Sequence, residues 1–521
     1  MTEAAVERFR ALTPSEFFYR NKELAGFSNP ARALYQTVRE LIENALDATD
    51  SHMIRPVIKV VVRREGEDRF FSVTVEDNGI GIPPAHVPQA FGQLLYSSKY
   101  VLRQTRGMFG LGAKMAVLYG QMTAGKPVEV VTSTILSKRI HHFKVSINIK
   151  SNTPSIVKKG SYSKLSEWHG TSVRIYLEGD WMRSKSKIYE YLKRTAIIAP
   201  YADIIFEDPE GNVLYFERSI SKLPIPPREV KPHPKGVDLE MLKMMASATK
   251  AKTLKDFLVK EFQSVGEVTA LRIISRAGLD PRKSPKSLRG HEVERLVRAI
   301  KEDDKIKPPK GDHLSFVGPE IIEAGLKAVL KPEFVAAVTR KPSVYGGHAF
   351  IVEAGIAYGG EIQPSDKPVL YRYANKIPLL YDEGSDVSRK VIDTIDWGVY
   401  GVSFPAPLAV LVHICSTKVP YKGVGKESVA DVPEVQKEIE LAVREVARRL
   451  RRYLMKKRRE REEAERAVAI VKYIPELVRS LKKIVGDVKE DMLEKELLKM
   501  VNMKLRAMRI NSVDEVVVAL E

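Results

Sequence analysis

Apolar side chains recur at helical spacing near the start of the chain. Residues 31–48 read ARALYQTVRELIENALDA, in which an apolar position returns about every three or four residues. The resulting stripe consists of Leu34, Val38, Leu41 and Ala45. This pattern predicts an amphipathic helix that packs one face on a core and leaves another face for polar side chains.

Short apolar runs predict strands after this helix, and two of them, 71–76 and 172–179, alternate apolar and polar positions. Residues 57–63 (VIKVVVR), 71–76 (FSVTVE) and 172–179 (SVRIYLEG) are short runs rich in β-branched residues. A glycine-rich loop at 107–112 precedes a second predicted helix, AKMAVLYGQM. The mixture predicts an α+β fold in which helices cover one face of a sheet.

Two proline-rich stretches punctuate the chain. Residues 222–236 and 305–312 have no periodic pattern, as is typical of linkers. The segment between them is helical and basic, and it is too long to be a loop. From residue 313 to about 425 strands and helices alternate again. The length of the chain, 521 residues, agrees with about three domains.

A long helix is expected to begin at Val432. Its apolar stripe consists of Val435, Ile439, Val443, Val446 and Leu450. The stripe stops at KKRREREE (456–463), which contains no apolar residue and is expected to stand in solvent or to cross a partner surface. Pro475 is expected to break the helix, and a short amphipathic tail should follow.

The composition favours a polyanionic partner. Lys and Arg number 85 against 66 Asp and Glu, which gives a net charge of +19 and makes nucleic acid the leading candidate. A charged surface suited to heat or salt is the alternative, and high charge content with one cysteine is typical of a thermophilic prokaryote. Cys415 stands alone, which suits a reducing cytoplasm. The sequence shows no signal peptide and no apolar run of bilayer length, so no membrane association is expected.

Polar side chains on the first predicted helix are candidates for a metal site. Glu40, Asn44 and Asp47 share one face because positions i, i+4 and i+7 align, and Glu43 lies beside them. Carboxylate and amide oxygens suit magnesium. For this helix alone, a solvated polar face is the better interpretation.

Glycines accompany three further motif blocks. In VEDNGIGIP (75–83), Asp77 could accept a hydrogen bond from an exocyclic amine, and Gly79 and Gly81 would let a flat base approach, although an ordinary Asn-Gly turn explains the pattern about as well. In RGMFGLGAKM (106–115), three glycines could point backbone N–H groups at an anion beside a helix N-terminus. In WHGTSV (168–173), Thr171 could support a base or a water molecule.

Together, and in this order, the four motif blocks resemble the conserved boxes of the gyrase, chaperone, MutL and histidine-kinase ATPase superfamily. The resemblance covers residues 1 to about 220 and implies the Bergerat ATPase fold, with ATP and Mg²⁺ as cofactors. It implies that Glu40 is the general base, Asn44 the magnesium ligand, Asp77 with Gly81 the adenine reader, and Thr171 an adenine-side support. The implied phosphate-binding lid comprises Ser98, Lys99, Gly107, Met108, Phe109, Gly110, Leu111, Gly112, Ala113 and Lys114.

Within the superfamily the chain resembles the B subunits of topoisomerase VI. The similarity includes the entry segment that begins PSEFFYRNKELAGFSNP, the inserted segment with VTALRIISRAGLDP, and YRYANKIPLLYDE (371–383). GVGKES (423–428) resembles the loop of an ATP-sensing lysine, which would be Lys426. Thr417-Lys418 resembles the pair used for that role in gyrase-like relatives, so Lys418 is the rival.

The resemblance implies four domains and a clamp mechanism. The expected domains are a strap with ATPase domain (1–228), a helix–two-turn–helix domain (229–306), a transducer with a stalk helix (307–470) and a tail that contacts a partner subunit (471–521). The implied protein is archaeal and cytoplasmic. It would dimerise on ATP binding, trap double-stranded DNA and form an A2B2 heterotetramer with a subunit that carries the catalytic tyrosine.

Two other functions stay open on the sequence. One is a MutL-like ATPase switch, and the other is a non-enzymatic DNA-binding scaffold whose ATP site has decayed. Glu40 and the lid glycines are present, which favours an active ATPase over the scaffold. The sequence contains no D-x-D triplet that could hold a DNA-cleavage metal, so cleavage is expected to belong to the partner.

Overall fold

The computed structural model describes residues 11–66, 69–97, 101–107, 110–423, 425–486 and 489–507. The chain divides into two compact units. The first comprises Met1–Ile395 with Phe404–Val446, and the second comprises Asp396–Ser403 with Ala447–Glu521. The four domain boundaries expected from the sequence stay a prediction.

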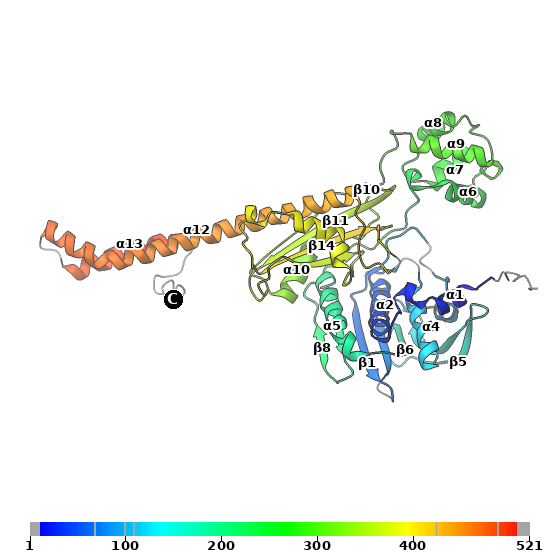
Figure 1. Cartoon of the computed structure of the whole chain (residues 1–521), viewed down its shortest axis with the longest axis horizontal. Helices are drawn as coiled ribbons and strands as arrows, with labels where there is room; N and C mark the ends of the chain where they lie inside the picture. Colours follow the sequence, from blue (N-terminus) through cyan, green and yellow to red (C-terminus); the bar gives the residue numbers. More distant parts are fainter. Residues whose placement is uncertain are drawn as a thin grey trace, which may run out of the picture. The chain divides into compact units, whose positions relative to one another are not determined.

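The first unit contains an eight-stranded mixed sheet in the order β5-β4-β3-β6-β2-β1-β7-β8, in which only the β1–β7 pair is parallel among the described pairings. Its strands are β1 (Val57–Arg64), β2 (Phe70–Asp77), β3 (Val128–Ser133), β4 (Arg139–Asn148), β5 (Thr153–Ser163), β6 (Gly170–Glu178), β7 (Asp203–Glu207) and β8 (Val213–Phe216). Figure 1 shows α2 (Pro30–Asp50), α4 (Gly112–Ala124) and α5 (Trp181–Ile198) beside this sheet. The expected α+β architecture is therefore confirmed.

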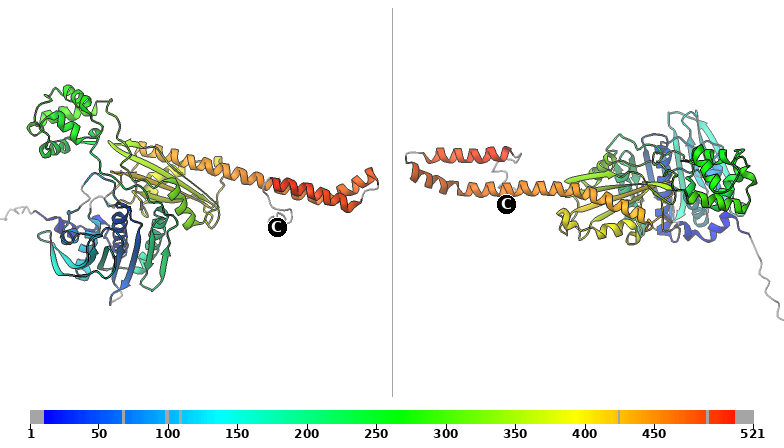
Figure 2. Two further views of the ribbon diagram at one scale, coloured as in Figure 1. Left: turned by 180° about the vertical axis from the view of Figure 1, so that it is seen from behind. Right: turned by 90° about the horizontal axis from the view of Figure 1, so that it is seen from above.

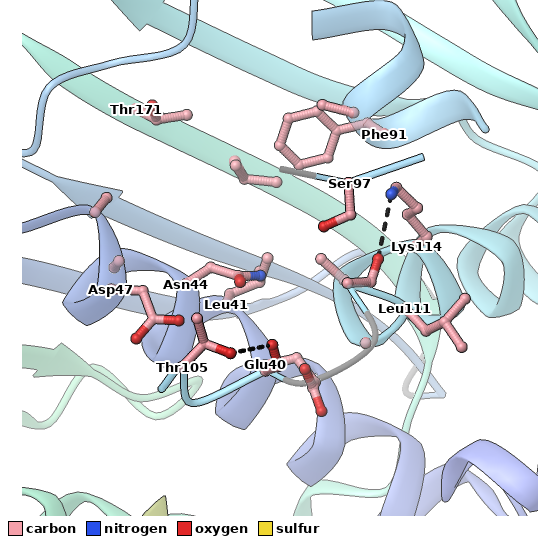
Figure 3. A pocket seen from close by; sticks show the side chains of 18 of the residues that line it. Glu40, Leu41, Asn44, Asp47, Phe91, Ser97, Thr105, Leu111, Lys114 and Thr171 are labelled. Atoms are coloured by element: carbon pink, nitrogen blue, oxygen red, sulfur yellow. Dashed lines mark hydrogen bonds between the residues drawn. The ribbon is translucent and has the colours of Figure 1, made fainter. Parts of the chain in front are cut away.

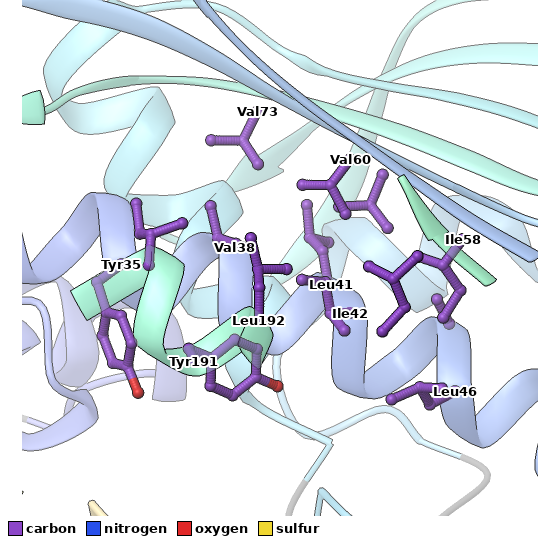
Figure 4. Packing of buried hydrophobic residues seen from close by; sticks show 14 of the residues in the cluster. Tyr35, Val38, Leu41, Ile42, Leu46, Ile58, Val60, Val73, Tyr191 and Leu192 are labelled. Carbon is purple, nitrogen blue, oxygen red and sulfur yellow. The ribbon is translucent and has the colours of Figure 1, made fainter. Parts of the chain in front are cut away.

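The first predicted helix is present as α2, and its apolar stripe packs into the core against this sheet. All four residues of its apolar stripe are buried, and they pack with Val60 and Val73 of the sheet and Leu192 of α5 (Figure 4). Leu34, Val38 and Leu41 each contribute about 2 kcal/mol when they leave water. The helix begins at N-cap Asn29, whose side chain accepts a hydrogen bond from the Arg32 N–H (2.9 Å), and Pro30 occupies its first turn. Short helices α1 (Pro14–Arg20) and α3 (Val87–Gly92) complete this part.

A second sheet follows later in the same unit. Its order is β10-β11-β14-β12-β13, with β9 paired to β11. The strands are β9 (Phe334–Thr339), β10 (Ser343–Tyr345), β11 (His348–Tyr358), β12 (Val369–Ala374), β13 (Ile377–Pro378) and β14 (Leu408–Ser416). Every residue of β14 is buried, so both faces of this strand are covered, as in the centre of a layered fold. Helices α10 (Pro319–Leu330) and α11 (Val387–Thr394) belong to this part.

The inserted segment between the proline-rich stretches is helical, as expected. Its helices are α6 (Leu239–Ala248), α7 (Leu254–Glu261), α8 (Glu267–Arg276) and α9 (Gly290–Lys301). They enclose an apolar cluster of their own, which includes Phe257, Ile273 and Leu296. A separate core is what a folded domain has and a structureless linker lacks.

The long helix is present but does not stop where expected. Helix α12 runs from Pro433 to Val485, with Pro475 inside it, so the prediction of a break there is wrong. A proline inside a helix costs roughly 3 kcal/mol, but Ile474 and Val478 on either side are buried. Helix α13 (Glu490–Ala507) lies alongside this stretch (Figure 2), and such packing offsets the lost hydrogen bond.

The charged part of α12 behaves as expected. Five of the eight residues at 456–463 are exposed and the other three are partly buried. Their ion pairs run along the helix at i, i+4, as between Arg458 and Glu462 (2.8 Å). No described helix is both long and apolar enough to cross a membrane. The cytoplasmic location stays a prediction.

Candidate nucleotide-binding site

A cavity of about 650 Å³ lies in the first unit and collects the predicted site residues. Figure 3 shows its lining seen from close by, with α2 and the start of α4 on one side. Every described residue of the predicted site lines it: Glu40, Asn44, Asp77, Gly81, Gly107, Gly110, Leu111, Gly112, Ala113, Lys114, Thr171 and Lys426. Ser98, Lys99, Met108 and Phe109 lie outside the described residues.

Asp77 forms one end of the cavity at the last residue of β2. Its Oδ1 accepts hydrogen bonds from the backbone N–H groups of Gly79 (2.8 Å) and Thr171 (3.3 Å). Burial nevertheless raises the pKa of Asp77 to about 7, and the two N–H groups oppose this shift only in part. The carboxyl is therefore poised between its two protonation states near neutral pH, and an amine donor from a ligand would favour the ionised form.

Three glycines allow the chain to close around Asp77. Gly170 has φ +132°, and a Cβ there would lie 1.9 Å from the carbonyl oxygen of Asp77. Gly81 has φ +73°, and a Cβ would lie 2.2 Å from the carbonyl oxygen of Ser133. At Gly79 a Cβ would lie 2.8 Å from Oδ1 of Asp77 itself. These contacts exclude any side chain, so the glycines do more than form the ordinary turn considered for 75–83.

Glu40 lies where α2 meets the start of α4. Its Oε1 accepts a hydrogen bond from Gln36 Nε2 (2.9 Å). A Cβ on Gly112 would lie 1.7 Å from Glu40 Oε2, so the carboxylate rests directly on this glycine. Gly112 is the first residue of α4, and its N-cap makes no side-chain hydrogen bond. The backbone N–H groups of the first turn and the dipole of this helix end favour anions.

Asn44 lies one turn further along α2 than Glu40, within the same cavity. The described residues contain no group of three His, Cys, Asp or Glu side chains that could cage a metal. Magnesium bound with a nucleotide keeps waters and phosphate oxygens and needs only one or two protein oxygens. The side-chain oxygen of Asn44 is a ligand that suits a metal of this kind.

The other acidic side chains of α2 have partners of their own. Glu43 does not line the cavity; its Oε1 pairs with Arg39 Nε (2.7 Å) below the surface. Asp47 lines the cavity and pairs with Arg106 Nη1 (3.1 Å). Arg106 immediately precedes Gly107 in the glycine loop, so this pair joins α2 to the loop.

Lys114 is buried against the glycine loop. Its Nζ donates to the carbonyl oxygens of Tyr96 and of Gly110, the latter at 3.2 Å. The expected role of Lys114 in phosphate binding therefore needs this ammonium to exchange a carbonyl for a phosphate oxygen. Thr171, at the other side, lies 3.2 Å from the hydroxyl of Thr132 (Oγ1 to Oγ1).

The second sheet contributes one loop to the cavity. Gly425 and Lys426 line it, whereas Lys418 is exposed and does not. Lys426 Nζ donates to the carbonyl oxygen of Arg106 (3.4 Å). The loop is held by a buried pair, since Asp386 Oδ2 accepts from the Val429 N–H (2.8 Å) and from Arg372 Nη1 (3.1 Å).

Sequence reasoning missed several residues around the loop. Arg106 and Asp50 form a buried ion pair (2.7 Å), and the ammonium of Lys376 lies 3.7 Å from the same Asp50 oxygen. Gln104 bonds the backbone of Ser315 twice. One sequence signal was available, because Asn375 stands between two apolar runs and asparagine is common in two-residue hairpin turns.

Comparison with known proteins agrees with this geometry. Residues 29–178 match the family described as histidine kinase-, DNA gyrase B- and HSP90-like ATPase, and residues 309–466 match the topoisomerase VI B subunit transducer. Among solved structures the chain is similar to the 43K ATPase domain of Thermus thermophilus gyrase B, with 14% identity over 85% of this chain and 91% of that chain. The TM-score there is 0.40, too low to add to the assignment.

Full-length relatives give a stronger similarity. The chain is 56% identical over 495 residues to the B subunit of type 2 DNA topoisomerase 6 from Metallosphaera sedula, covering 94% of this chain and 93% of the relative. It is 55% identical over 511 residues to the protein of the same name from Sulfurisphaera tokodaii, covering 96% of each. The MutL-like switch and the scaffold are therefore not favoured. The chain belongs to the family of topoisomerase VI B subunits, the ATP-binding subunits of an ATP-dependent type II DNA topoisomerase.

Proposed function

We propose that the cavity binds Mg-ATP with the residues assigned from the sequence and that Glu40 is the general base of hydrolysis. The observation that supports this most is convergence. Side chains from four separate motif blocks and from the loop of Lys426 line one cavity, although they span residues 40 to 426. Residues so distant along the chain meet in one place only when the fold brings them together.

The division of labour follows the geometry. Asp77, with Gly81 and Thr171 beside it, accepts a hydrogen bond from the exocyclic amine of adenine, and the backbone N–H groups at the start of α4 receive the phosphates. Glu40 takes a proton from the attacking water while the γ-phosphoryl group leaves ADP. Magnesium, when bound, supplies charge neutralisation to the phosphates, and Asn44 is the side chain that holds it.

Lys426 is the residue that senses the terminal phosphate. Its ammonium rests on the carbonyl oxygen of Arg106, a neutral partner at the long distance of 3.4 Å. A γ-phosphate is a stronger partner for an ammonium than a carbonyl, and it disappears on hydrolysis. The position of the Gly425–Lys426 loop therefore depends on which nucleotide is bound.

At the level of the assembly, ATP binding closes two chains into a dimer and captures a DNA duplex. The residues before about 30 act as a strap between the chains, and a separate A subunit with the catalytic tyrosine cuts DNA in an A2B2 complex. ATP can shift this equilibrium only through a higher affinity for the closed state. The domain limits expected from the sequence (1–228, 229–306, 307–470 and 471–521) belong to the same proposal.

The decisive test of the site is Glu40→Gln in the full chain. This variant should bind ATP with wild-type affinity and lose about two to four orders of magnitude in hydrolysis rate, because only the base is removed. Asn44→Ala should instead weaken Mg-ATP binding itself. Wild-type hydrolysis by Glu40→Gln contradicts the assignment.

Lys426 is tested against Lys418. Lys426→Ala should still bind ATP but lose most hydrolysis, whereas Lys418→Ala should retain it, because Lys418 does not reach the cavity. Steady-state hydrolysis and equilibrium nucleotide binding measure the two properties separately. The reverse pattern would give the sensing role to Lys418.

A further inference from the structure

A second lysine of the transducer part reaches toward the ATP cavity without lining it. Lys376 lies in the two-residue turn between β12 and β13. Only 5% of its side chain is exposed. Its Nζ donates to Ser315 Oγ (2.7 Å) and lies 3.7 Å from Asp50 Oδ2. Asp50 is the last residue of α2, the helix that carries Glu40 and Asn44.

Lys376 combines two unfavourable features in one residue. Its φ is +66° and that of Asn375 is +48°, the left-handed conformation that glycine adopts at little cost and a lysine adopts under strain. Burial also removes its ammonium from water and lowers the pKa of Lys376, an effect that the charge of Asp50 opposes. Strain and a buried charge that persist together at one position point to function more than to stability.

The turn is fixed from behind by a second polar chain. The backbone N–H of Lys376 donates to His413 Nε2 (3.0 Å), and His413 Nδ1 lies 2.8 Å from Glu353 Oε2. Glu353 also accepts the backbone N–H groups of Val317 and Gly318, each at 2.7 Å. These partners belong to the second sheet or to the two residues just before α10. The ammonium is thus mounted on the core of this sheet.

In front of Lys376 the network reaches the glycine loop. Asp50 Oδ2 accepts Arg106 Nη2 at 2.7 Å and Tyr201 OH at 2.9 Å in addition to the lysine charge. Ser315 is bonded through its backbone to Gln104, two residues before Arg106. The same Arg106 gives its carbonyl oxygen to Lys426. Lys426 therefore contacts Arg106 directly, and Lys376 is linked to Arg106 through Asp50.

We propose that Lys376 is a positioning residue for ATP hydrolysis: by holding Asp50 it fixes Arg106 and the start of the glycine loop in the geometry that the reaction needs. This proposal rests on the proposed function of the cavity. Lys376 does not line the cavity, so its loss should leave ground-state binding largely intact and act on the chemical step. A purely structural ion cluster would lower stability without such a selective effect.

The test compares Lys376→Met with Lys367→Met, an exposed lysine that precedes β12, in the full chain. Lys376→Met should lower the kcat of ATP hydrolysis about tenfold or more while KM changes less than about threefold, and Lys367→Met should match the wild type. Unchanged kcat in Lys376→Met, or an equal loss in both variants, overturns the proposal. Should Lys376→Met not fold, Asp50→Asn removes the carboxylate that the ammonium holds, and unchanged kcat there overturns it as well.

A double-mutant cycle with Asp50→Asn tests the route. In the Asp50→Asn background the carboxylate that the lysine holds is already gone, so Lys376→Met should cause no further loss of kcat. Losses that multiply would show that Lys376 does not act through Asp50 and would overturn the proposal. Glu40→Gln is measured in parallel: if it hydrolyses ATP normally the proposed site is wrong, whereas loss in Glu40→Gln with normal Lys376→Met rejects the role of Lys376 alone.

Discussion

Two glycines of the site allow close approaches that any side chain would prevent. Gly112 leaves room for the carboxylate of Glu40 at the start of α4, and Gly170 leaves room for the backbone of Asp77. The neighbour of Gly112 is the movable end of a side chain, whereas that of Gly170 is backbone. A methyl group at Gly112 should therefore disturb chemistry without disturbing the fold.

Gly112→Ala is expected to displace the Glu40 carboxylate and lower ATP hydrolysis about tenfold or more, because a general base must lie within hydrogen-bond reach of its proton. The thermal unfolding midpoint should stay near that of the wild type. Gly160→Ala on β5 is the matched control, since a Cβ there meets no heavy atom within 4 Å. Equal hydrolysis by Gly112→Ala and Gly160→Ala would contradict the placement of Glu40.

Asp77 makes nucleotide affinity depend on pH. With a pKa of about 7, raised by burial, the carboxyl is mostly protonated at mildly acidic pH and mostly ionised above neutrality. An adenine amine needs the ionised acceptor, so the dissociation constant should fall about tenfold between about pH 6 and about pH 8. Calorimetry across this range measures it. Asp77→Asn should lack this step, which separates the effect of the carboxyl from titration of the phosphates.

The same shift affects stability in a defined direction. The folded pKa of about 7 exceeds the ordinary value of 3.8, so the folded state holds a proton that the unfolded state releases. Stability from this group is present below the unfolded pKa and is lost as the pH rises through the folded one. Relative to Asp77→Asn, the wild type should therefore lose unfolding free energy from about pH 4 to about pH 7. A constant difference over that range would contradict the buried, protonated state.

At the scale of elements, α2 serves two purposes with two faces. Its apolar stripe packs between the first sheet and α5, while Glu40 and Asn44 reach the cavity from a neighbouring face of the helix. The inserted helices α6 to α9, in contrast, do not pack into the core of either sheet, because they enclose a core of their own. Such a segment can be removed without opening another core.

Replacement of residues 237–304 by a short Gly-Ser linker is expected to weaken binding to double-stranded DNA and to reduce its salt dependence. Arg282, Lys286 and Arg289 are exposed in the loops of this segment, and each phosphate contact made by such a residue releases counterions. Titrations of duplex DNA at several salt concentrations measure both effects. Unchanged affinity and slope would make the segment a spacer, while hydrolysis of ATP without DNA should persist in either case.

For the whole molecule, the ATP cavity depends on residues of both sheets in the first unit. Lys426 and Lys376 come from the second sheet, and the cavity itself lies under α2 and α4 of the first. Nucleotide binding can therefore be coupled to the relative position of the two sheets, with a coupling free energy that comes from a few polar contacts. The reaction of the family is that of an ATP-dependent type II DNA topoisomerase.

A non-hydrolysable ATP analogue is expected to convert the isolated chain of 58.6 kDa into a dimer, as measured by sedimentation. Glu40→Gln should dimerise with ATP itself, because it binds but does not turn over. The isolated chain should form no covalent adduct with DNA under any of these conditions, since it lacks a D-x-D metal site. A mass that stays monomeric at saturating analogue, or an adduct without a partner subunit, would refute the clamp model.

The sequence by itself determined most of the elements and pointed to residues that line one cavity. Helical and alternating periodicities predicted α2, β1, β2 and β6 to within two residues, because these patterns report local backbone geometry and one buried face. The site residues assigned from the sequence came from the four motif blocks, apart from Lys426, which was assigned from the resemblance of its loop. All of them that the structure describes line the cavity. The order of the blocks along the chain was sufficient for this assignment, because each block contains residue types suited to one part of the site.

Only the tertiary structure decided how distant segments meet. It placed Lys426 in the cavity and left Lys418 outside, and it continued α12 through Pro475 where local propensity predicted an end. It also brought Asp50, Arg106 and Lys376 into one buried cluster. These three residues are far apart along the chain and show no shared period. Their attraction depends on burial and on a few ångströms of distance, which packing of the complete fold determines.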